Sequence, residues 1–497
     1  MTNLNGQNSL KILITKTMLN TTFIGNTVEE LLNKFLNVIE PIDLIQVLQN
    51  DIGDELLKFQ VKYKESIIID SLKIPRSLYI VAICYRLNYL ISIHGWAIMQ
   101  EYGVIYLYNG YYWIRTEVDQ IKKFLGSASE SMGYYSPADT RTAQFAETIY
   151  KQFLISSDIP NRSLSKSKVL INLRNGTYDV ENGNLRDHQA KDYMMYCLPY
   201  DYNPLDRCPL YLKYLNHVLP EKNTQLVLQE FHGYIFMDLK LEKALILYGK
   251  GANGKSVQFE ITRALLGEKN VSTKTLGDLL DMDMGNDSRA KLKNKLVNFG
   301  SEIRANKMDS DIFKRLVSGE PVAAREKYKT SFDLENTCKF IFNANELPAT
   351  TEYTESFFRR FLIIPYNQFI SDNERDPELH SKIIEKELSG ILNWVILGLN
   401  RLTQQKYFTY SQAVEETLST YKKESNSIIH FIEESNLKKS QNNRISTAML
   451  YSSYLHFCEL NSLNYHKKTE FSKMMKILNF ENYRTSNERG FCVEFQK

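Results

Sequence analysis

The chain has 497 residues, of which 43% are hydrophobic and 12% aromatic, enough for several ordinary globular cores. Its net charge of +3 excludes a strong overall basic field, so any surface for nucleic acid must be local. No run reaches the roughly 18 apolar residues of a membrane span, and the six cysteines and eight histidines form no CxxC, H-x₃-H or H-E-x-x-H pattern, so we expect a soluble intracellular protein with no membrane contact and no such metal motif.

The first 90 residues predict helices and carry no chemistry that we can assign. Amphipathic patterns cover 28–36 and 54–59. Asp70 closes a short apolar run, but no second acid follows two residues later. Because a two-metal polymerase or primase site needs paired carboxylates, we do not expect this region to make primers.

Residues 91–208 predict a small mixed α+β module. Apolar runs at 104–108 and 111–115 flank Asn109-Gly110, and runs at 169–174 and 177–180 flank Asn175-Gly176. Because Asn-Gly supplies the two residues with positive φ that a type I′ turn requires, each pair predicts a β-hairpin. The polar stretch between the hairpins is typical of helices.

Residues 244–266 predict a buried strand, a glycine-rich loop and an amphipathic helix. The segment 249–256 fits the pattern G-x-x-x-x-G-K-[ST]. In this context the glycines let backbone N–H groups turn toward phosphates, and the helix N-terminus adds its partial positive charge. We therefore expect the chain to bind a nucleoside triphosphate.

The loop assigns a task to each of its side chains. Lys255 would reach the β- and γ-phosphates, and the Ser256 hydroxyl would ligate Mg²⁺. The residues expected to bind ATP are Gly249, Gly251, Asn253, Gly254, Lys255 and Ser256.

Two later apolar runs end in polar side chains, as strands of the same sheet would. The run 295–300 is followed by Ser301 and Glu302, and the run 339–344 by Asn345. Glu302 could help to hold Mg²⁺ and polarise the attacking water, and Asn345 could sense the γ-phosphate or that water. An ordinary solvated glutamate is the alternative for Glu302.

Two further segments are basic. Residues 322–334 predict a hairpin with Lys327, Tyr328 and Lys329 near its tip, and Arg359-Arg360 precede another apolar strand. Lysines at a hairpin tip also keep a sheet edge soluble, so contact with nucleic acid is one of two explanations.

The C-terminal part predicts helices followed by a small mixed module. Two helical patterns at 445–460 and 467–478 precede a strand pair, an order typical of winged helices. Residues 435–497 hold ten lysines and arginines against five acids. Contact with duplex phosphates and docking of another protein both fit this piece.

Taken in this order, the motifs resemble the superfamily 3 helicases, the hexameric replicative ATPases of small DNA viruses, satellite phages and poxviruses. Within them, the phage, plasmid and poxvirus primase–helicases are most similar, over roughly 90–497 and including the Asn175-Gly176-Thr-Tyr-Asp pattern. The resemblance implies an α/β fold: a helical region of unknown role at 1–90, an α+β module at 91–208, an AAA-type P-loop ATPase core at 209–405, and a helical linker with a winged-helix-like domain at 406–497. No primase domain is apparent.

The resemblance also implies roles for individual residues. Arg360 corresponds to an arginine finger that acts in the neighbouring subunit's site, and Arg359 to a structural ion-pair partner. One departure is that Ser301-Glu302 offers a single acid where two adjacent acids are common. The remaining matches are Gly249, Gly254, Lys255 and Ser256 to the Walker A loop, Glu302 to Walker B, Asn345 to the polar sensor, and Lys327, Tyr328 and Lys329 to the DNA-binding pore hairpin.

The expected protein is therefore an ATP-hydrolysing replicative DNA helicase of a phage, plasmid or similar mobile element. It would form a homo-oligomer, a hexameric ring that uses ATP and Mg²⁺ and moves on single-stranded DNA at forks, in a bacterial cytoplasm or at a viral replication site. A separate primase is a candidate partner. One alternative is an origin-binding initiator in which ATP drives assembly, and another is a small-molecule P-loop kinase, which would show no dependence on DNA.

Overall fold

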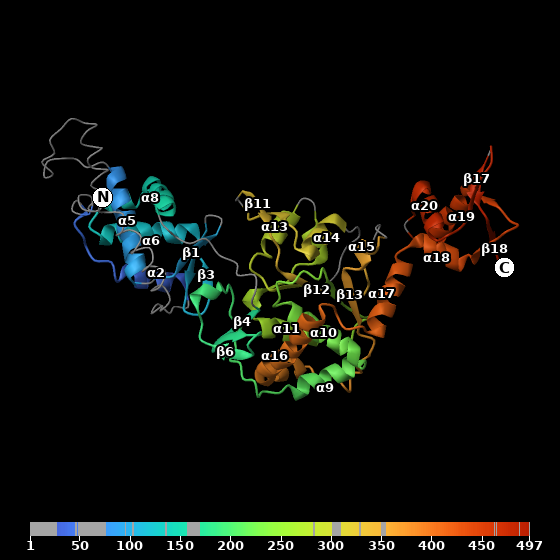
Figure 1. Ribbon diagram of the computed structural model, residues 1–497, viewed down its shortest axis with the longest axis horizontal. Coiled ribbons are helices and arrows are strands. Elements are labelled where there is room, and N and C mark those ends of the chain that lie inside the picture. Colours follow the sequence, from blue (N-terminus) through green and yellow to red (C-terminus); the bar gives the residue numbers. More distant parts are fainter. Residues whose placement is uncertain are drawn as a thin grey trace, which may run out of the picture. The chain divides into compact units, whose positions relative to one another are not determined.

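The computed structural model describes residues 27–44, 47, 76–94, 96–101, 104–134, 137–156, 169–281, 284–300, 310–327, 330–348, 354–461, 463, 465–486 and 488–496. By its internal contacts the chain divides into two compact units, Met1–Tyr202 and Asn203–Lys497. Figure 1 colours the elements of both units along the sequence. The finer domain bounds at 90, 208 and 405 stay predictions.

In the first unit, helices and one face of an antiparallel sheet, order β1-β2-β3, share an apolar core. Phe35, Leu87, Leu125 and Phe145 from the helices and Leu107 from the sheet are buried in it. The elements are α2 (Val28–Leu36), α5 (Arg76–His94), β1 (Ile98–Glu101), β2 (Val104–Tyr108), β3 (Trp113–Arg115), α6 (Val118–Ser131), α7 (Pro137–Thr140) and α8 (Ala143–Ser156).

A second antiparallel sheet in this unit has the order β4-β5-β6, with β4 (Leu170–Leu173), β5 (Gly176–Asp179) and β6 (Asn184–Arg186). Both expected hairpins are therefore confirmed, but the expected type I′ turns are wrong. Tyr108 pairs with Trp113, so four residues connect β2 and β3. The Asn109 side-chain oxygen accepts hydrogen bonds from the N–H groups of Tyr111 and Tyr112. In the second hairpin, Gly176 lies inside β5, where a Cβ would meet the Arg186 carbonyl oxygen of β6 at 2.6 Å. That glycine serves the approach of two strands and not the turn.

The second unit is built on a parallel sheet with the order β13-β7-β12-β9-β8. Its strands are nearly all apolar, as strands covered on both faces must be, and four of the five residues of β7 are fully buried. The strands are β7 (Ala244–Tyr248), β8 (Val271–Ser272), β9 (Val297–Gly300), β12 (Lys339–Ala344) and β13 (Phe361–Pro365). The expected mixed α/β architecture is confirmed.

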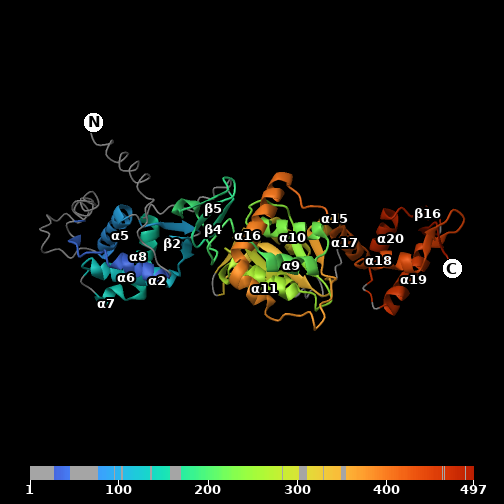
Figure 2. The ribbon, with the colours of Figure 1, turned by 90° about the horizontal axis from the view of Figure 1, so that it is seen from below.

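Helices cover both faces of this sheet (Figure 1). Ala244 and Ile246 of β7 face a core that includes Leu279, Phe313 and Phe357 from helices on one side. Figure 2 shows α9, α10, α11 and α16 gathered on the other side. The helices are α9 (Pro209–Val218), α10 (Lys222–Tyr234), α11 (Lys255–Leu266), α12 (Leu276–Leu280), α13 (Gly285–Ala290), α14 (Ser310–Ser318), α15 (Glu355–Phe358), α16 (Leu379–Gln405) and α17 (Gln412–Glu424).

Helices α10 and α16 approach each other through glycines. A Cβ on Gly233 would meet the Leu399 main chain at 2.7 Å, and one on Gly398 would meet the Gln229 carbonyl oxygen at 2.6 Å. Helix α9 is fixed to α16 in another way, because the buried Glu387 carboxylate accepts hydrogen bonds from two N–H groups at the N-terminus of α9, both at 2.9 Å. A charged acceptor at that end of a helix satisfies N–H groups that have no partner within it.

The last elements form a small mixed module. They are α18 (Ser427–Glu434), β14 (Leu437–Lys439), β15 (Ile445–Ser446), α19 (Thr447–Leu460), α20 (Lys468–Ile477), β16 (Asn482–Arg484), β17 (Arg489–Phe491) and β18 (Val493–Phe495). The expected helices and antiparallel pair are present, while Cys492 divides the last expected strand in two. Their assignment as a winged helix stays a prediction.

Candidate nucleotide-binding site

The glycine loop follows β7 and leads directly into α11, as expected. Gly251 has φ +108° and Gly254 has φ +90°, a region that side chains other than glycine rarely adopt. A Cβ on Gly249 would meet the Tyr366 carbonyl oxygen at 2.5 Å, whereas one on Gly251 would meet nothing within 4 Å. The loop is therefore tight at its start and open at its middle, where it borders the pocket.

Hydrogen bonds from the segment after β13 hold the loop in place. The Asn253 amide nitrogen donates to the Tyr366 carbonyl oxygen at 2.9 Å, and the Ile370 N–H donates to the Ala252 carbonyl oxygen at 2.8 Å. From α9, the Tyr214 hydroxyl donates to the Gly254 carbonyl oxygen at 2.9 Å. The loop is thus preorganised by two separate parts of the second unit.

Lys255 folds back over the loop. Its ammonium group donates to the Gly249 carbonyl oxygen and, at 3.1 Å, to the Asn253 side-chain oxygen. Burial lowers the pKa of Lys255, because a charged group loses hydration there. Phosphate oxygens would be better partners for this cation than neutral carbonyls. Ser256, one residue further, is exposed in the first turn of α11.

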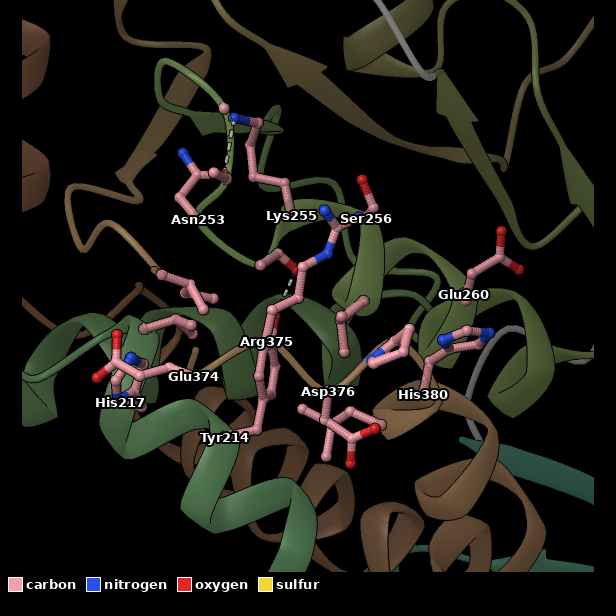
Figure 3. Close-up of a pocket in the computed structure, with 18 of the residues that line it drawn as sticks. Tyr214, His217, Asn253, Lys255, Ser256, Glu260, Glu374, Arg375, Asp376 and His380 are labelled. Atoms are coloured by element: carbon pink, nitrogen blue, oxygen red, sulfur yellow. Dashed lines mark hydrogen bonds between the residues drawn. The ribbon is translucent and has the colours of Figure 1, made fainter. Parts of the chain in front are cut away.

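A pocket of about 1440 Å³ opens beside the loop (Figure 3). Its walls come from the glycine loop, from α9, from the end of β12 and from the segment that leads into α16. The charged and polar side chains in the walls include Lys213, His217, Lys255, Ser256, Glu260, Asn343, Asn345, Arg375 and His380. A volume of this size exceeds that of ordinary small-ligand sites, so a nucleotide has ample room.

Strand β12 brings two asparagines to the pocket. Asn345 follows its last residue, is exposed and lines the pocket, where it was expected. Asn343, which the sequence interpretation missed, lines it as well, and its buried side-chain oxygen has no hydrogen-bond partner among the described residues. A buried acceptor without a donor costs free energy, so this oxygen is suited to a water molecule or another donor in the pocket.

The acid predicted to follow β9 lies outside the described residues. Glu302 and Ser301 both belong to the stretch 301–309, although β9 itself is present and pairs with β12 up to Gly300. The strand therefore runs to the edge of the sheet at which the loop after β7 begins.

Arg360 lies at the opposite edge of the sheet. It precedes Phe361, which pairs with Ala244 at the start of β7, so the length of a five-residue strand, about 16 Å, separates it from its own glycine loop. Its guanidinium is buried, lies 3.2 Å from the Glu242 carboxylate and donates to the Ser318 hydroxyl at 3.0 Å. A role in a neighbouring subunit stays a prediction, and in this structure those contacts hold the side chain inside its own chain.

Arg359 is the more accessible member of the pair. Its side chain is 57% exposed, and it too contacts Glu242, at 2.8 Å. The two arginines thus share one carboxylate, and the expected ion pair of Arg359 is present.

The expected basic hairpin is confirmed. β10 (Val322–Arg325) and β11 (Ser331–Leu334) pair antiparallel, and Lys327 is exposed in the turn between them. Tyr328 and Lys329 lie outside the described residues. The hairpin is fastened to α13, because Arg289 donates to the Ala323 carbonyl oxygen at 2.8 Å.

The residues at the glycine loop fit a triphosphate with Mg²⁺. The N-cap Gly254 provides no side-chain acceptor for the first N–H groups of α11, which leaves them for an anion. Within the described residues, no three His, Cys, Asp or Glu side chains are grouped as a metal site.

Comparisons with known proteins bear on this geometry. The family described as "D5 N terminal like" matches residues 84–220, and a family of unknown function, DUF5906, matches residues 247–360, which include the glycine loop and Arg360. A protein of Acanthamoeba polyphaga mimivirus, provisionally named a helicase, is 24% identical over 237 residues, 45% of this chain and 24% of that protein. The expected resemblance to the superfamily 3 primase–helicases is thus confirmed.

A second relative of this chain, from Invertebrate iridescent virus 3 and also provisionally named a helicase, is 22% identical over 328 residues, 59% of the chain and 35% of that protein. The matches thus span between about a quarter and about a third of these relatives' own length. A solved apo structure of the NrS-1 C-terminal region covers 82% of this chain and 98% of that chain, at 12% identity and a TM-score of 0.47. Within the described residues, no helix has the length and apolar character needed to cross a membrane.

Proposed function

We propose that this chain is an ATP-dependent replicative DNA helicase of a virus, phage or similar mobile element. The observation that carries the proposal is the glycine loop, with Lys255 and Ser256, at the wall of a pocket of about 1440 Å³. A nucleotide pocket alone fits many enzymes. The order of the further motifs and the viral relatives favour the helicase class.

In this proposal the chain binds ATP by its phosphates. Backbone N–H groups of the loop and of the first turn of α11 contact the β-phosphate, and Lys255 exchanges its carbonyl partners for phosphate oxygens. Mg²⁺, held through Ser256, supplies charge neutralisation on the phosphates when it is bound. Glu302 orients a water molecule, whose oxygen attacks the γ-phosphorus while the bond to the β-γ bridging oxygen breaks, giving ADP and phosphate. Asn345 contacts the γ-phosphate or that water.

The work on DNA is proposed to come from a ring of identical chains, with six as the expected number. Arg360 would leave Glu242 and reach the site of the next subunit. The hairpin carrying Lys327, Tyr328 and Lys329 would then contact one DNA strand in the centre. A separate primase would supply primers.

The test uses the full chain and the variant Lys255→Ala. The unaltered chain should hydrolyse ATP, do so faster with single-stranded DNA, and unwind a forked duplex, whereas Lys255→Ala should lose all three activities. Lys386 is exposed on α16 and does not line the pocket, so Lys386→Ala is the matched control. ATP hydrolysis that is indifferent to DNA would instead favour a small-molecule kinase or another P-loop enzyme.

One observation favours a second candidate, an origin-binding initiator. Lys468, Lys473 and Lys476 are exposed along α20, and Arg484 and Arg489 are exposed on the following strand pair. Exposed cations on a helix and an adjacent ribbon suit contact with duplex phosphates.

If the chain is an initiator, its affinity for duplex DNA should depend on salt concentration and on these lysines. Replacing Lys473 and Lys476 by Glu should lower duplex affinity and reduce the slope of log K against log salt by about 2, with ATP hydrolysis retained. The control replaces Lys386 and Lys423, both exposed on other helices, in the same way. Equal duplex affinity in both double variants would rule out the initiator hypothesis.

A further inference from the structure

Arg375 is a cation in the wall of the pocket with no ion pair or hydrogen bond among the described residues. It lies between β13 and α16 and lines the same pocket as Lys255 and Ser256. In Figure 3 its guanidinium is directed toward the side of the pocket where those two residues lie. None of the sequence motifs included it.

The acids beside Arg375 bond to other partners. The Glu374 carboxylate accepts hydrogen bonds from the N–H and the hydroxyl of Ser371, at 3.1 Å and 2.7 Å. The Asp376 carboxylate is paired with Lys382 at 2.7 Å. Both flanking carboxylates thus have other hydrogen-bonding partners, and the guanidinium is available to an anion in the pocket.

The segment that carries Arg375 is anchored at both ends. At one end the Ile370 N–H is bonded to Ala252 of the glycine loop. At the other end Asp376 accepts from the Glu378 N–H at 3.0 Å, and Leu379 begins the long helix α16. A short segment held in this way places its side chains with little loss of conformational entropy on binding.

Arg360 cannot supply this charge to its own site, because it lies at the far edge of the sheet and is held by Glu242. We infer that Arg375 is a second in-chain cation of the triphosphate site and contacts the phosphates of a bound nucleotide together with Lys255. A guanidinium fits this role, since it forms paired, charge-assisted hydrogen bonds with phosphate oxygens. The inference rests on the proposed ATP binding at the glycine loop.

The first experiment measures the binding of a fluorescent AMP-PNP to the full chain. Arg375→Ala should raise Kd about tenfold or more, Arg375→Lys should recover part of the loss, and Lys386→Ala should bind like the unaltered chain. If Arg375→Ala binds as tightly as the unaltered chain, the inference is overturned while the proposed function stands. Absence of binding to the unaltered chain would overturn both.

The second experiment tests whether Arg375 acts within its own chain. Equal amounts of Lys255→Ala and Arg375→Ala proteins are mixed, and ATP hydrolysis is compared with the sum of the separate proteins. If both side chains serve one site of one chain, mixing gives no gain, because no site holds both. A gain on mixing would place Arg375 in a neighbour's site and overturn the in-chain assignment.

Discussion

The Asn253 side chain joins the glycine loop to the segment after β13, donating from its amide nitrogen to the Tyr366 carbonyl oxygen at 2.9 Å. The same carboxamide accepts from the Lys255 ammonium group at 3.1 Å. One buried side chain therefore fixes both the shape of the loop and the resting position of its lysine.

We expect Asn253→Ala to lower both the stability of the protein and its affinity for nucleotide. Loss of a buried hydrogen-bonding group should lower the free energy of unfolding by about 1–3 kcal/mol, and the released loop should raise KM for ATP. Urea unfolding and steady-state hydrolysis measure the two effects. Asn345→Ala is the control for stability, because that residue is exposed. An unchanged KM would show that the tether does not shape the loop.

Asn343 should show the opposite balance between stability and activity. Its side-chain oxygen is buried without a partner, so Asn343→Leu removes an unsatisfied group and should leave the free energy of unfolding equal or raise it by about 1 kcal/mol. If that oxygen accepts from water in the pocket, kcat should fall at the same time. A variant that is both less stable and fully active would contradict this account.

Arg360→Ala is expected to separate binding from turnover. If Arg360 is a finger for the next subunit, its removal should leave Kd for AMP-PNP unchanged and lower kcat by about 10³-fold or more. Mixing Arg360→Ala with Lys255→Ala should restore some hydrolysis, unlike the Arg375 mixture. Arg359→Ala is the neighbouring control, since Glu242 keeps its contact with Arg360.

The structure also predicts that the Arg360→Ala variant is less stable. Loss of its buried contacts with Glu242 and Ser318 should lower the free energy of unfolding by about 2 kcal/mol. Normal turnover by a folded Arg360→Ala protein would refute the finger and leave the residue a purely structural role.

The hairpin lysines should matter only when DNA is present. Lys327→Ala combined with Lys329→Ala should keep basal ATP hydrolysis and lose its stimulation by single-stranded DNA, as well as unwinding of forks. Lys327 is exposed at the turn, so its removal should leave the fold intact. Stimulation that persists in this double variant, measured beside Lys386→Ala, would show that the hairpin serves solubility.

His232 predicts a stability loss in mild acid. Its Nδ1 donates to the Leu228 carbonyl oxygen at 2.8 Å, and burial lowers the pKa of His232 from 6.5 to about 4. Between these values the unfolded chain binds a proton that the folded chain excludes, so stability falls as pH falls, by about 3 kcal/mol in total. Urea unfolding from pH 7 to 4 should show a smaller fall in His232→Gln. Parallel profiles would contradict the assignment.

The parallel sheet, the glycine loop and both basic segments were predictable because each rests on local signals. Apolar runs such as 244–248 predict buried strands, and the glycine spacing predicts the loop. The types of the two hairpin turns could not be predicted from local signals. At Asn109-Gly110 and Asn175-Gly176 the local preference is overruled by side-chain hydrogen bonds and by the approach of a third strand, neither of which is visible in a dipeptide.

The missed residues share one cause. Asn343 and Arg375 reach the pocket only because β12 and the segment before α16 are brought to the glycine loop from about 90 and 120 residues away in the chain. No spacing rule connects such positions. The burial of Arg360 was equally out of reach, since it depends on Glu242, which carries no motif.

The glycines at which α10 and α16 meet leave almost no gap between their backbones. Two helices packed this closely cannot shift or rotate independently of each other. Glu387 holds α9 against the same pair by its two hydrogen bonds. Helices α9, α10 and α16 are therefore expected to move as one rigid unit. In the proposed helicase, movements coupled to ATP hydrolysis would then come from the parts around these helices, the tethered glycine loop and the strand ends.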